Sequence, residues 1–285
     1  MTLERTSLKK ISLQLMATGL KSAEVKLIRA VKQLRAIRRS IATYARSKPH
    51  KIVKAKGKPK LNVSKSPPIE ISLLAGEMIY QMRSALDHLV FDVIRRNPNV
   101  SAIDPEWEEH CEFPLWTKPL KPGQKTPLPK AKFSRQLPGI ADVPFAFIER
   151  VQPYYGVGAT NNALRFLAHL SNIDKHRRLN LTRARIRQYE SVRYPSGLSA
   201  RGYSTLDRGA EIYPAPPMRP LSSPLDTKPE RPVYVKRHYR TLVAFNERRY
   251  LGEATSLTVD HLLELILEQI ETVVVPEFEK FIKKP

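Results

Sequence analysis

Four stretches of this sequence repeat apolar residues every three or four positions, which is the period of an amphipathic helix. They cover residues 21–46, 69–96, 160–178 and 257–283. Prolines lie at the ends of two of these stretches, since Pro49 follows the first and Pro68 precedes the second. Pro276 falls within the last stretch and predicts a kink there. The spacing predicts a mainly α fold of the α+β class, with four long helices that form a bundle.

The apolar stripes predict which face of each long helix is buried. The first helix is expected to bury Val25, Ile28, Val31, Leu34, Ile37, Ile41 and Tyr44. The second is expected to bury Ile71, Ala75, Met78, Met82, Leu86, Leu89 and Val93. The third is expected to bury Leu164, Leu167 and Leu170. We expect the last helix to turn an acidic face toward basic neighbours, and this face consists of Asp260, Glu264, Glu268 and Glu271.

From residue 179 onward the apolar period changes to two, which is typical of strands. The segments RLNLTRARIRQYE and VYVKRHYRTLVAF are therefore expected to form a small basic β-sheet inserted before the last helix. Residues 51–64 surround Gly57 and Pro59, which favours a basic hairpin or loop there.

The sequence predicts one main domain. Residues 1–20 form a basic N-terminal extension, and residues 21–285 form a single helical domain. Within that domain we expect a Pro-rich loop at 97–143, then a short helix at 145–151, and a β-rich insertion at about 179–250.

The net charge of the chain is strongly positive and unevenly distributed. The 285 residues contain 49 lysines and arginines against 27 acids, a formal charge of +22. Residues 1–65 hold 18 of these cations and only two acids, Glu4 and Glu24, so they supply +16 of the excess. Such a patch can neutralise phosphates and release their counterions. The expected partner is a nucleic acid, RNA ahead of DNA, and the alternative is a solvated basic face that binds nothing specific.

Composition also excludes several classes of protein. A single cysteine, Cys111, leaves no intramolecular disulfide and no cysteine-based zinc cluster. No run approaches the roughly 18 apolar residues of a transmembrane helix, and the N-terminus lacks a secretory pattern. We therefore expect a cytoplasmic chain with no membrane partner. Since no H-E-x-x-H, Walker A or G-x-G-x-x-G motif is present, we expect neither a metal nor a cofactor.

Three groups of basic residues are the candidate nucleic-acid contacts. The first helix contributes Lys26, Arg29, Lys32, Arg35, Arg38 and Arg39. The segment after it contributes Lys54, Lys56, Lys58 and Lys60. Strand alternation adds two rows, Arg183, Arg185 and Arg187 on the first strand and Lys236, His238 and Arg240 on the second. If the strands pair, they form a basic sheet face with Tyr189 and Tyr239 nearby for stacking. The alternative, to which we give equal weight, is that this basic face is an ordinary solvated outer face of the sheet.

Two short motifs combine cations, carboxylates and histidines on helices. RSALDH, in the second helix, contains Arg83, Asp87 and His88, and Asp87 can pair with Arg83 one turn away. NIDKHR, at the end of the third helix, supplies Asp174, His176 and Arg177. Asp174 falls on an apolar face, where a carboxylate needs a partner. Arg83 is the first partner we expect, ahead of Arg177.

The residues of these two motifs have the chemistry to cleave RNA without a metal. The candidate catalytic residues are Arg83, Asp87, His88, Asp174, His176 and Arg177. A histidine would transfer the proton, an arginine would hold the phosphate and an aspartate would orient them. The alternative is a non-catalytic binding or scaffold protein, in which the same side chains form a polar network that joins two helices.

Arg83 and His88 match the pattern R-x4-H, which resembles the motif of the HEPN domain family (higher eukaryotes and prokaryotes nucleotide-binding). The resemblance implies a helical bundle, a homodimer and a metal-independent ribonuclease of a bacterial toxin or defence system, with an acidic antitoxin as a further partner. It would make Arg83 the phosphate-holding cation and His88 the proton-transfer residue, meeting across the dimer interface. Ser84 stands where that family commonly has Asn, Asp or His.

The wider arrangement of motifs also resembles a family of uncharacterised bacterial proteins. It consists of GExxxxxRSALDHLVF, EFPLW, QPY and LSNIDKHR, over about residues 20–180. This resemblance implies that the two histidine motifs belong together, and it brings no known reaction.

Overall fold

The computed structural model places most of the chain in one mainly helical body with small antiparallel sheets. The structure describes residues 20–55, 58–117, 133–154, 163–175, 182–194, 199–206, 210, 234–246 and 257–283. All but the last residue of the predicted N-terminal extension therefore lies outside the described residues. Leu20, which begins them, is fully buried and belongs to the core.

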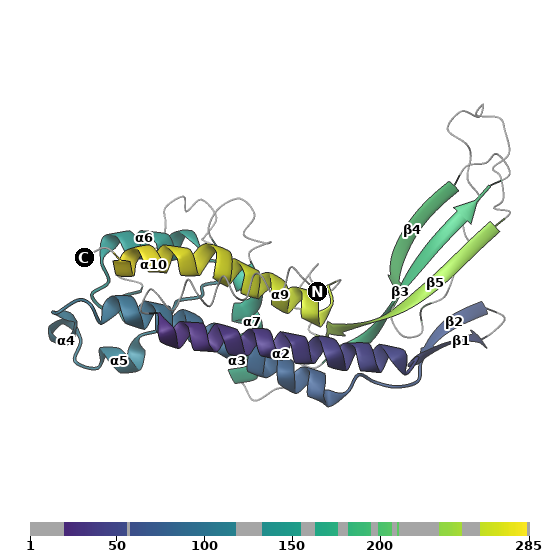
Figure 1. The fold of residues 1–285 in the computed structure, drawn as a ribbon, viewed down its shortest axis with the longest axis horizontal. Coiled ribbons are helices and arrows are strands. Elements are labelled where there is room, and N and C mark those ends of the chain that lie inside the picture. Colours follow the sequence, from purple (N-terminus) through teal and green to yellow (C-terminus); the bar gives the residue numbers. More distant parts are fainter. Residues whose placement is uncertain are drawn as a thin grey trace, which may run out of the picture.

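Helices α2 (Lys21–Arg46) and α3 (Ile69–Ile94) lie side by side along the body (Figure 1). The stripe that was predicted to be buried on α2 needs correction, because Val25, its first residue, is 64% exposed. The buried seam of α2 starts one turn earlier and uses alanines, and it consists of Leu20, Ala23, Leu27, Ala30, Leu34, Ile37 and Tyr44. The steps between these residues are three and four as far as Ile37, and the last step to Tyr44 is seven, which is two turns, so they lie on one face of the helix.

The stripe predicted for α3 is confirmed except at its last residue, Val93, which is half-buried. Helix α3 is buried on more than one side, since α2, α7, α9 and α10 all contact it. This central position explains why small and polar residues such as Ala85 and Asp92 are buried beside the larger side chains of the stripe.

Shorter helices follow α3 in the chain. They are α4 (Val100–Ile103), α5 (Trp107–His110), α6 (Asp142–Arg150) and α7 (Ala163–Lys175). The segment 97–143 is therefore not all loop, since it contains α4, α5 and the start of α6, and its residues 118–132 lie outside the described residues. Leu164, Leu167 and Leu170 of α7 are fully buried, as predicted.

The C-terminal helix is interrupted by one wide turn. It consists of α9 (Val259–Gln269), a π turn (Ile270–Val274) and α10 (Val275–Lys283). Pro276 is the second residue after this turn and has no N–H for an intrahelical hydrogen bond, which is a physical reason for the irregularity predicted there. The acidic face of α9 does meet a basic neighbour, because Arg38 Nη2 lies 2.6 Å from Glu264 Oε1.

Two antiparallel sheets extend from one end of the helical body. Strands β1 (His50–Ala55) and β2 (Lys58–Val63) pair between α2 and α3, so the segment predicted as a hairpin or loop is a hairpin. Strands β3 (Thr182–Arg193) and β5 (Tyr234–Phe245) pair as predicted, in the chain segment between α7 and α9. Strand β4 (Ser199–Leu206), which the sequence analysis missed, pairs with the other edge of β3.

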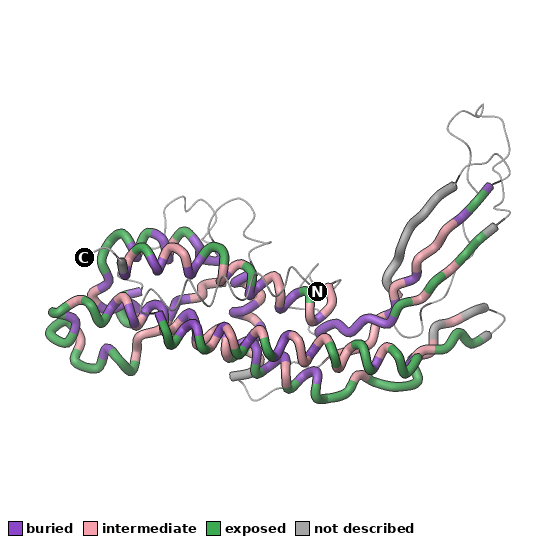
Figure 2. The backbone as a smooth tube through the Cα atoms, viewed as in Figure 1, coloured by how far each residue is buried: buried purple, intermediate pink, exposed green. Residues whose placement is uncertain are grey.

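The three-stranded sheet projects beyond the helices, on the same end as the hairpin (Figure 1). Residues 241–245, at its base, are buried against α2 and α9, whereas residues 235 and 236 near its tip are exposed (Figure 2). The sheet is therefore anchored on the helices at its base, and residues 235 and 236 near its tip are outside this packing. Within the described residues, no helix is both long and apolar enough to cross a membrane.

Candidate nucleic-acid interface

The predicted pair of Arg83 and Asp87 is present, and it has a third member. Arg83 Nη2 lies 3.2 Å from Asp87 Oδ1 and 3.3 Å from Glu112 Oε2. The side chain of Arg83 is only 12% exposed. Glu112 was missed by the sequence analysis, because it comes from the segment that was predicted as loop. Two carboxylates already compensate the charge of this guanidinium, so a phosphate would have to compete with them for it.

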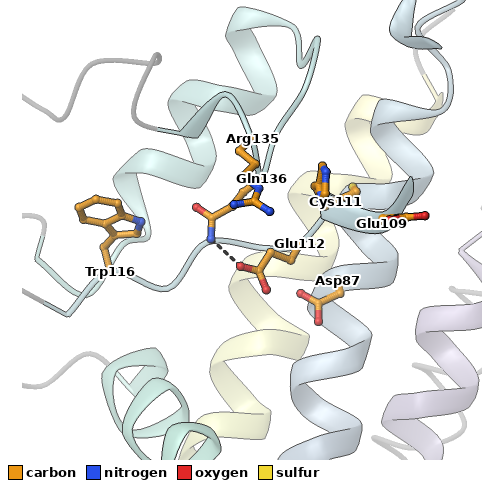
Figure 3. A pocket seen from close by; sticks show the side chains of 8 residues that line it. Asp87, Glu109, Cys111, Glu112, Trp116, Arg135 and Gln136 are labelled. Atoms are coloured by element: carbon orange, nitrogen blue, oxygen red, sulfur yellow. Dashed lines mark hydrogen bonds between the residues drawn. The ribbon is translucent and has the colours of Figure 1, made fainter. Parts of the chain in front are cut away.

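Further hydrogen bonds fix this network in place. The backbone N–H of Phe113 donates to Asp87 Oδ1 over 2.9 Å, and Gln136 Nε2 donates to Glu112 Oε1 over 2.6 Å (Figure 3). The Asp87 and Glu112 carboxylates thus tie the segment after α5 to α3. This is the arrangement expected of a polar network that joins elements of the fold.

A pocket of about 700 Å³ opens beside the network (Figure 3). Its lining consists of Asp87, Glu109, His110, Cys111, Glu112, Trp116, Arg135 and Gln136. Burial first, and then the charges of Asp87 and Glu112, together raise the pKa of the Cys111 thiol to about 12. Cys111 is therefore a neutral thiol in this pocket and not an activated nucleophile.

His88 acts electrostatically on a different carboxylate from the two that pair with Arg83. Burial raises the pKa of Asp92, one turn along α3, and the charges of Arg95, His88 and Arg96 act in the opposite direction. The Asp92 carboxylate is 5% exposed and pairs with Arg95 Nη2 at 3.1 Å. His88 thus lies in the electrostatic environment of Asp92, while Arg83 pairs with Asp87 and Glu112.

The second motif cannot be placed beside the first. Asp174 belongs to α7, but its side chain lies outside the described residues, as do His176 and Arg177. The predicted Arg83–Asp174 pair therefore stays a prediction. Helices α3 and α7 do contact each other, which is compatible with it.

The six predicted cations of α2 have different surroundings. Arg38 pairs with Glu264 and lies 3.8 Å from Asp260, so it holds α2 against α9. Lys26 Nζ lies 5.5 Å from the ring centroid of Tyr80. The remaining four are exposed or half-buried, and they are Arg29, Lys32, Arg35 and Arg39.

Of the hairpin cations, Lys60 is half-buried, while Lys56 and the side chains of Lys54 and Lys58 lie outside the described residues. The hairpin meets the three-stranded sheet through His50, whose Nδ1 lies 3.1 Å from Thr241 Oγ1. Thr241 lies on the opposite side of the pleat from Arg240. The basic hairpin and the predicted basic sheet face therefore share one end of the molecule but lie on different sides of the sheet.

The β3–β5 register brings the predicted strand cations together. Arg187 lies directly opposite Arg240, and the next pair on the same face is Tyr189 opposite His238. Arg240 and His238 are exposed. The prediction that Tyr239 accompanies this basic face was wrong, because Tyr239 lies opposite Gln188 on the other face. Its ring centroid lies 6.4 Å from that of His50.

Strand β4 extends these pairs into rows across the whole sheet. Tyr203 is the register partner of Tyr189, so one row consists of Tyr203, Tyr189 and His238. The neighbouring row toward the tip consists of Arg201, Ser191 and Lys236. The neighbouring row toward the base consists of Thr205, Arg187 and Arg240. By register, the row of Tyr203, Tyr189 and His238, called the aromatic row below, lies between a row that contains Arg187 and Arg240 and a row that contains Arg201 and Lys236.

The remaining two strand arginines lie where the sheet joins the body. Arg185 is opposite Leu242 and Arg183 is opposite Ala244, and both partners are buried. On the reverse face, Arg237 Nη2 lies 2.6 Å from Glu190 Oε1, so that face carries a compensated ion pair. The two faces of the sheet therefore differ, since Arg237 pairs with Glu190 on the reverse face while the predicted strand cations lie on the face of the aromatic row.

In comparisons with known proteins, neither a family model nor a curated protein nor a solved structure matches the chain. Within the described ranges, no three His, Cys, Asp or Glu side chains gather closely enough to hold a metal ion. The candidate interface therefore has to be interpreted from its own chemistry.

Proposed function

We propose that this chain binds single-stranded RNA on the face of the β4–β3–β5 sheet that carries the aromatic row. The observation that carries the proposal is the register, which sets Tyr203, Tyr189 and His238 between two cationic rows. Aromatic rings stack on unpaired bases, and flanking arginines and lysines hold the phosphates. The chain-wide charge of +22 favours the same class of partner.

A direct test is the affinity of the protein for a short unpaired RNA, measured by fluorescence anisotropy at several salt concentrations. Arg187→Gln and Arg240→Gln should weaken binding and reduce its salt dependence, because each removes a phosphate contact. Tyr189→Ala should weaken binding by about tenfold through lost stacking. Lys280→Gln serves as a control, because it removes a charge from α10, which lies at the end of the body away from the sheet (Figure 1). Equal losses in all four variants would contradict the proposal.

The ribonuclease implied by the R-x4-H motif has less support in this geometry. Arg83 is paired with Asp87 and Glu112, and His88 lies near Asp92 instead. We therefore favour the non-catalytic alternative, in which the motif is a polar network. Incubation of the protein with RNA in EDTA decides between them, since cleavage that is lost in His88→Ala while the variant still folds and binds would restore the enzyme hypothesis.

A further inference from the structure

The outer face of α2 carries a row of positive charge along its whole length. At about 100° of rotation per residue, these cations lie within about 40° of one line along the helix. They are Lys21, Lys32, Arg35, Arg39 and Arg46, called the α2 row below. Arg35 is half-buried and the other four are exposed. The row lies on the side of the helix opposite the buried seam that includes Ala30 and Ile37, so it faces solvent.

Most of the charge of the α2 row is not compensated. Glu24 is the one acid in α2, and it is 3% exposed, one turn from Lys21. Within the described residues, no ion pair joins Lys32, Arg35 or Arg39 to a carboxylate. These three cations are three and four residues apart, a spacing at which like charges repel each other. A bound polyanion would relieve this repulsion and would release its own counterions.

The α2 row differs in its chemistry from the sheet face, because it offers no ring to a base. Tyr44, the single aromatic residue of α2, is buried in the seam. Cations without an exposed ring contact the phosphate backbone and leave the bases unread. In a duplex the bases are stacked inside, and the two strands together present phosphates more densely than one strand does. The α2 row therefore suits paired nucleic acid, whereas the aromatic row of the sheet suits unpaired bases.

The length and the end point of the α2 row connect it with the sheet. From Lys21 to Arg46 the helix rises about 37 Å, close to one turn of a duplex at about 34 Å. Arg46 is the last residue of α2, and the hairpin follows it at His50. The sheet projects from this same end of the body (Figure 1), and α2 contacts β5. One RNA can therefore meet the row with one part and the sheet with the next.

We propose that the α2 row binds the paired stem of an RNA whose unpaired segment occupies the sheet face. The inference rests on the proposed function for the second of these contacts, and it names the class of RNA as a stem next to an unpaired segment. The stem supplies phosphates to the row, and the unpaired bases stack on Tyr189 and its neighbours. Since the row contacts only the backbone, the stem has no preferred sequence.

The test measures the binding of the full chain to three RNA probes by fluorescence anisotropy over a range of salt concentrations. The probes are a blunt duplex, a single-stranded oligouridylate, and the same duplex with an oligouridylate tail. The parent protein should bind the tailed duplex more tightly than either simple probe, because only this probe engages both surfaces at once.

The decisive variant combines Lys32→Gln, Arg35→Gln and Arg39→Gln. Its binding to the blunt duplex should weaken, while its binding to the oligouridylate should be retained. The slope of log K against log salt for the duplex should fall by about 2.7, or about 0.9 for each of the three lost phosphate contacts. This variant should melt no lower than the parent, because it removes repulsion between like charges.

A charge-matched control removes three exposed cations from other elements, and it combines Arg135→Gln, Arg150→Gln and Lys280→Gln. Because it has the same net charge as the row variant, it separates a local contact from the general attraction of a basic protein for RNA. The control should bind the blunt duplex with the salt slope of the parent. Equal duplex binding by the control and the row variant would overturn the inference, and retained oligouridylate binding would leave the proposed function standing.

The remaining outcomes also decide between the two surfaces. Equal loss of the duplex and the oligouridylate in the row variant would mean that the row holds single strands, which overturns its assignment to a stem. If the parent binds the duplex through the row but does not bind the oligouridylate, the proposed function fails while the row keeps its stem. Vesicles that contain phosphatidylserine are the last probe, and vesicle binding that depends on the row, without duplex binding, would assign the row to a membrane surface instead.

Discussion

His50 Nδ1 and Thr241 Oγ1 lie 3.1 Å apart, so a residue at the start of β1 touches a residue near the base of β5. The His50 ring also approaches Tyr239, with 6.4 Å between the ring centroids. This contact joins the hairpin between α2 and α3 to the sheet between α7 and α9. Two insertions far apart in the chain thereby hold each other in place.

Stability should depend on pH through His50. Burial lowers the pKa of this histidine below 6.5, so its contribution is present above that value and is lost as pH falls through the lower folded pKa. His50→Gln removes the titration, and the difference in unfolding free energy between the variant and the parent should change with pH across this window. Denaturant unfolding at several pH values measures it. His238→Gln changes an exposed histidine on the other face, and identical pH profiles for both variants and the parent would refute the prediction.

Lys48→Gly should stabilise the fold. Lys48 follows the end of α2 with a φ of 48°, a left-handed conformation that costs an L-residue about 1 kcal/mol. Glycine adopts it freely, although its unfolded chain is also more flexible, so the net gain should be about 1 kcal/mol or less. Thermal unfolding measures the gain. Lys48→Ala removes the same charge but keeps a Cβ, and equal melting temperatures for the two variants would show that charge, not backbone strain, is responsible.

Cys111 should react slowly with alkylating reagents in the folded protein. With its pKa raised to about 12, only about one thiol in ten thousand is ionised at about pH 8. Iodoacetamide labelling followed by mass spectrometry should be roughly a thousandfold slower than in denaturant, where the thiol has an ordinary pKa. Glu112→Gln should speed the reaction modestly, because burial is the larger cause. Fast labelling of the native protein would show that the pocket activates this thiol.

Glu271→Gln should stabilise the protein at neutral and higher pH. Burial raises the pKa of Glu271 from 4.5 to about 7, with a further contribution from the charge of Glu268. The folded state therefore favours the protonated acid, and this contribution is fully present below 4.5 and lost as pH rises through about 7. The variant should gain up to about 3 kcal/mol at about pH 8 and little at about pH 4.

Unfolding titrations of Glu271→Gln at both pH values test this sign. Glu268→Gln offers a graded control, because it removes only the smaller of the two causes and should stabilise less. A gain for Glu271→Gln that is the same at both pH values would mean that the carboxylate carries no titration penalty.

Long, strongly periodic elements were predictable from the sequence. Helix α3 follows its apolar stripe closely, whereas the buried face of α2 was placed wrongly at Val25. The alanines that complete its seam, Ala23 and Ala30, carry a weak hydrophobic signal, although their small size allows α3 to approach closely. Gln33 is buried as well, and local periodicity gives no reason for it.

The polar network was only half predictable. The pair of Arg83 and Asp87 follows from helical spacing, since the two residues are one turn apart. Glu112 joins it from a segment 29 positions away, and that distance in the chain leaves no periodic trace. The aromatic row was hard to predict for a similar reason. Tyr189 and His238 are neighbours only through strand register, which the sequence pattern alone does not determine.

The paired strands β3 and β5 bring the two ends of a long insertion together, with Thr182 opposite Phe245 at its base. The chain thus leaves the helical body and returns to it at almost the same point. The outer part of this insertion, beyond the buried residues 241–245 at its base, can be exchanged for another hairpin or sheet without moving the entry and exit points. New binding preferences can therefore be grafted onto this scaffold without redesigning its core.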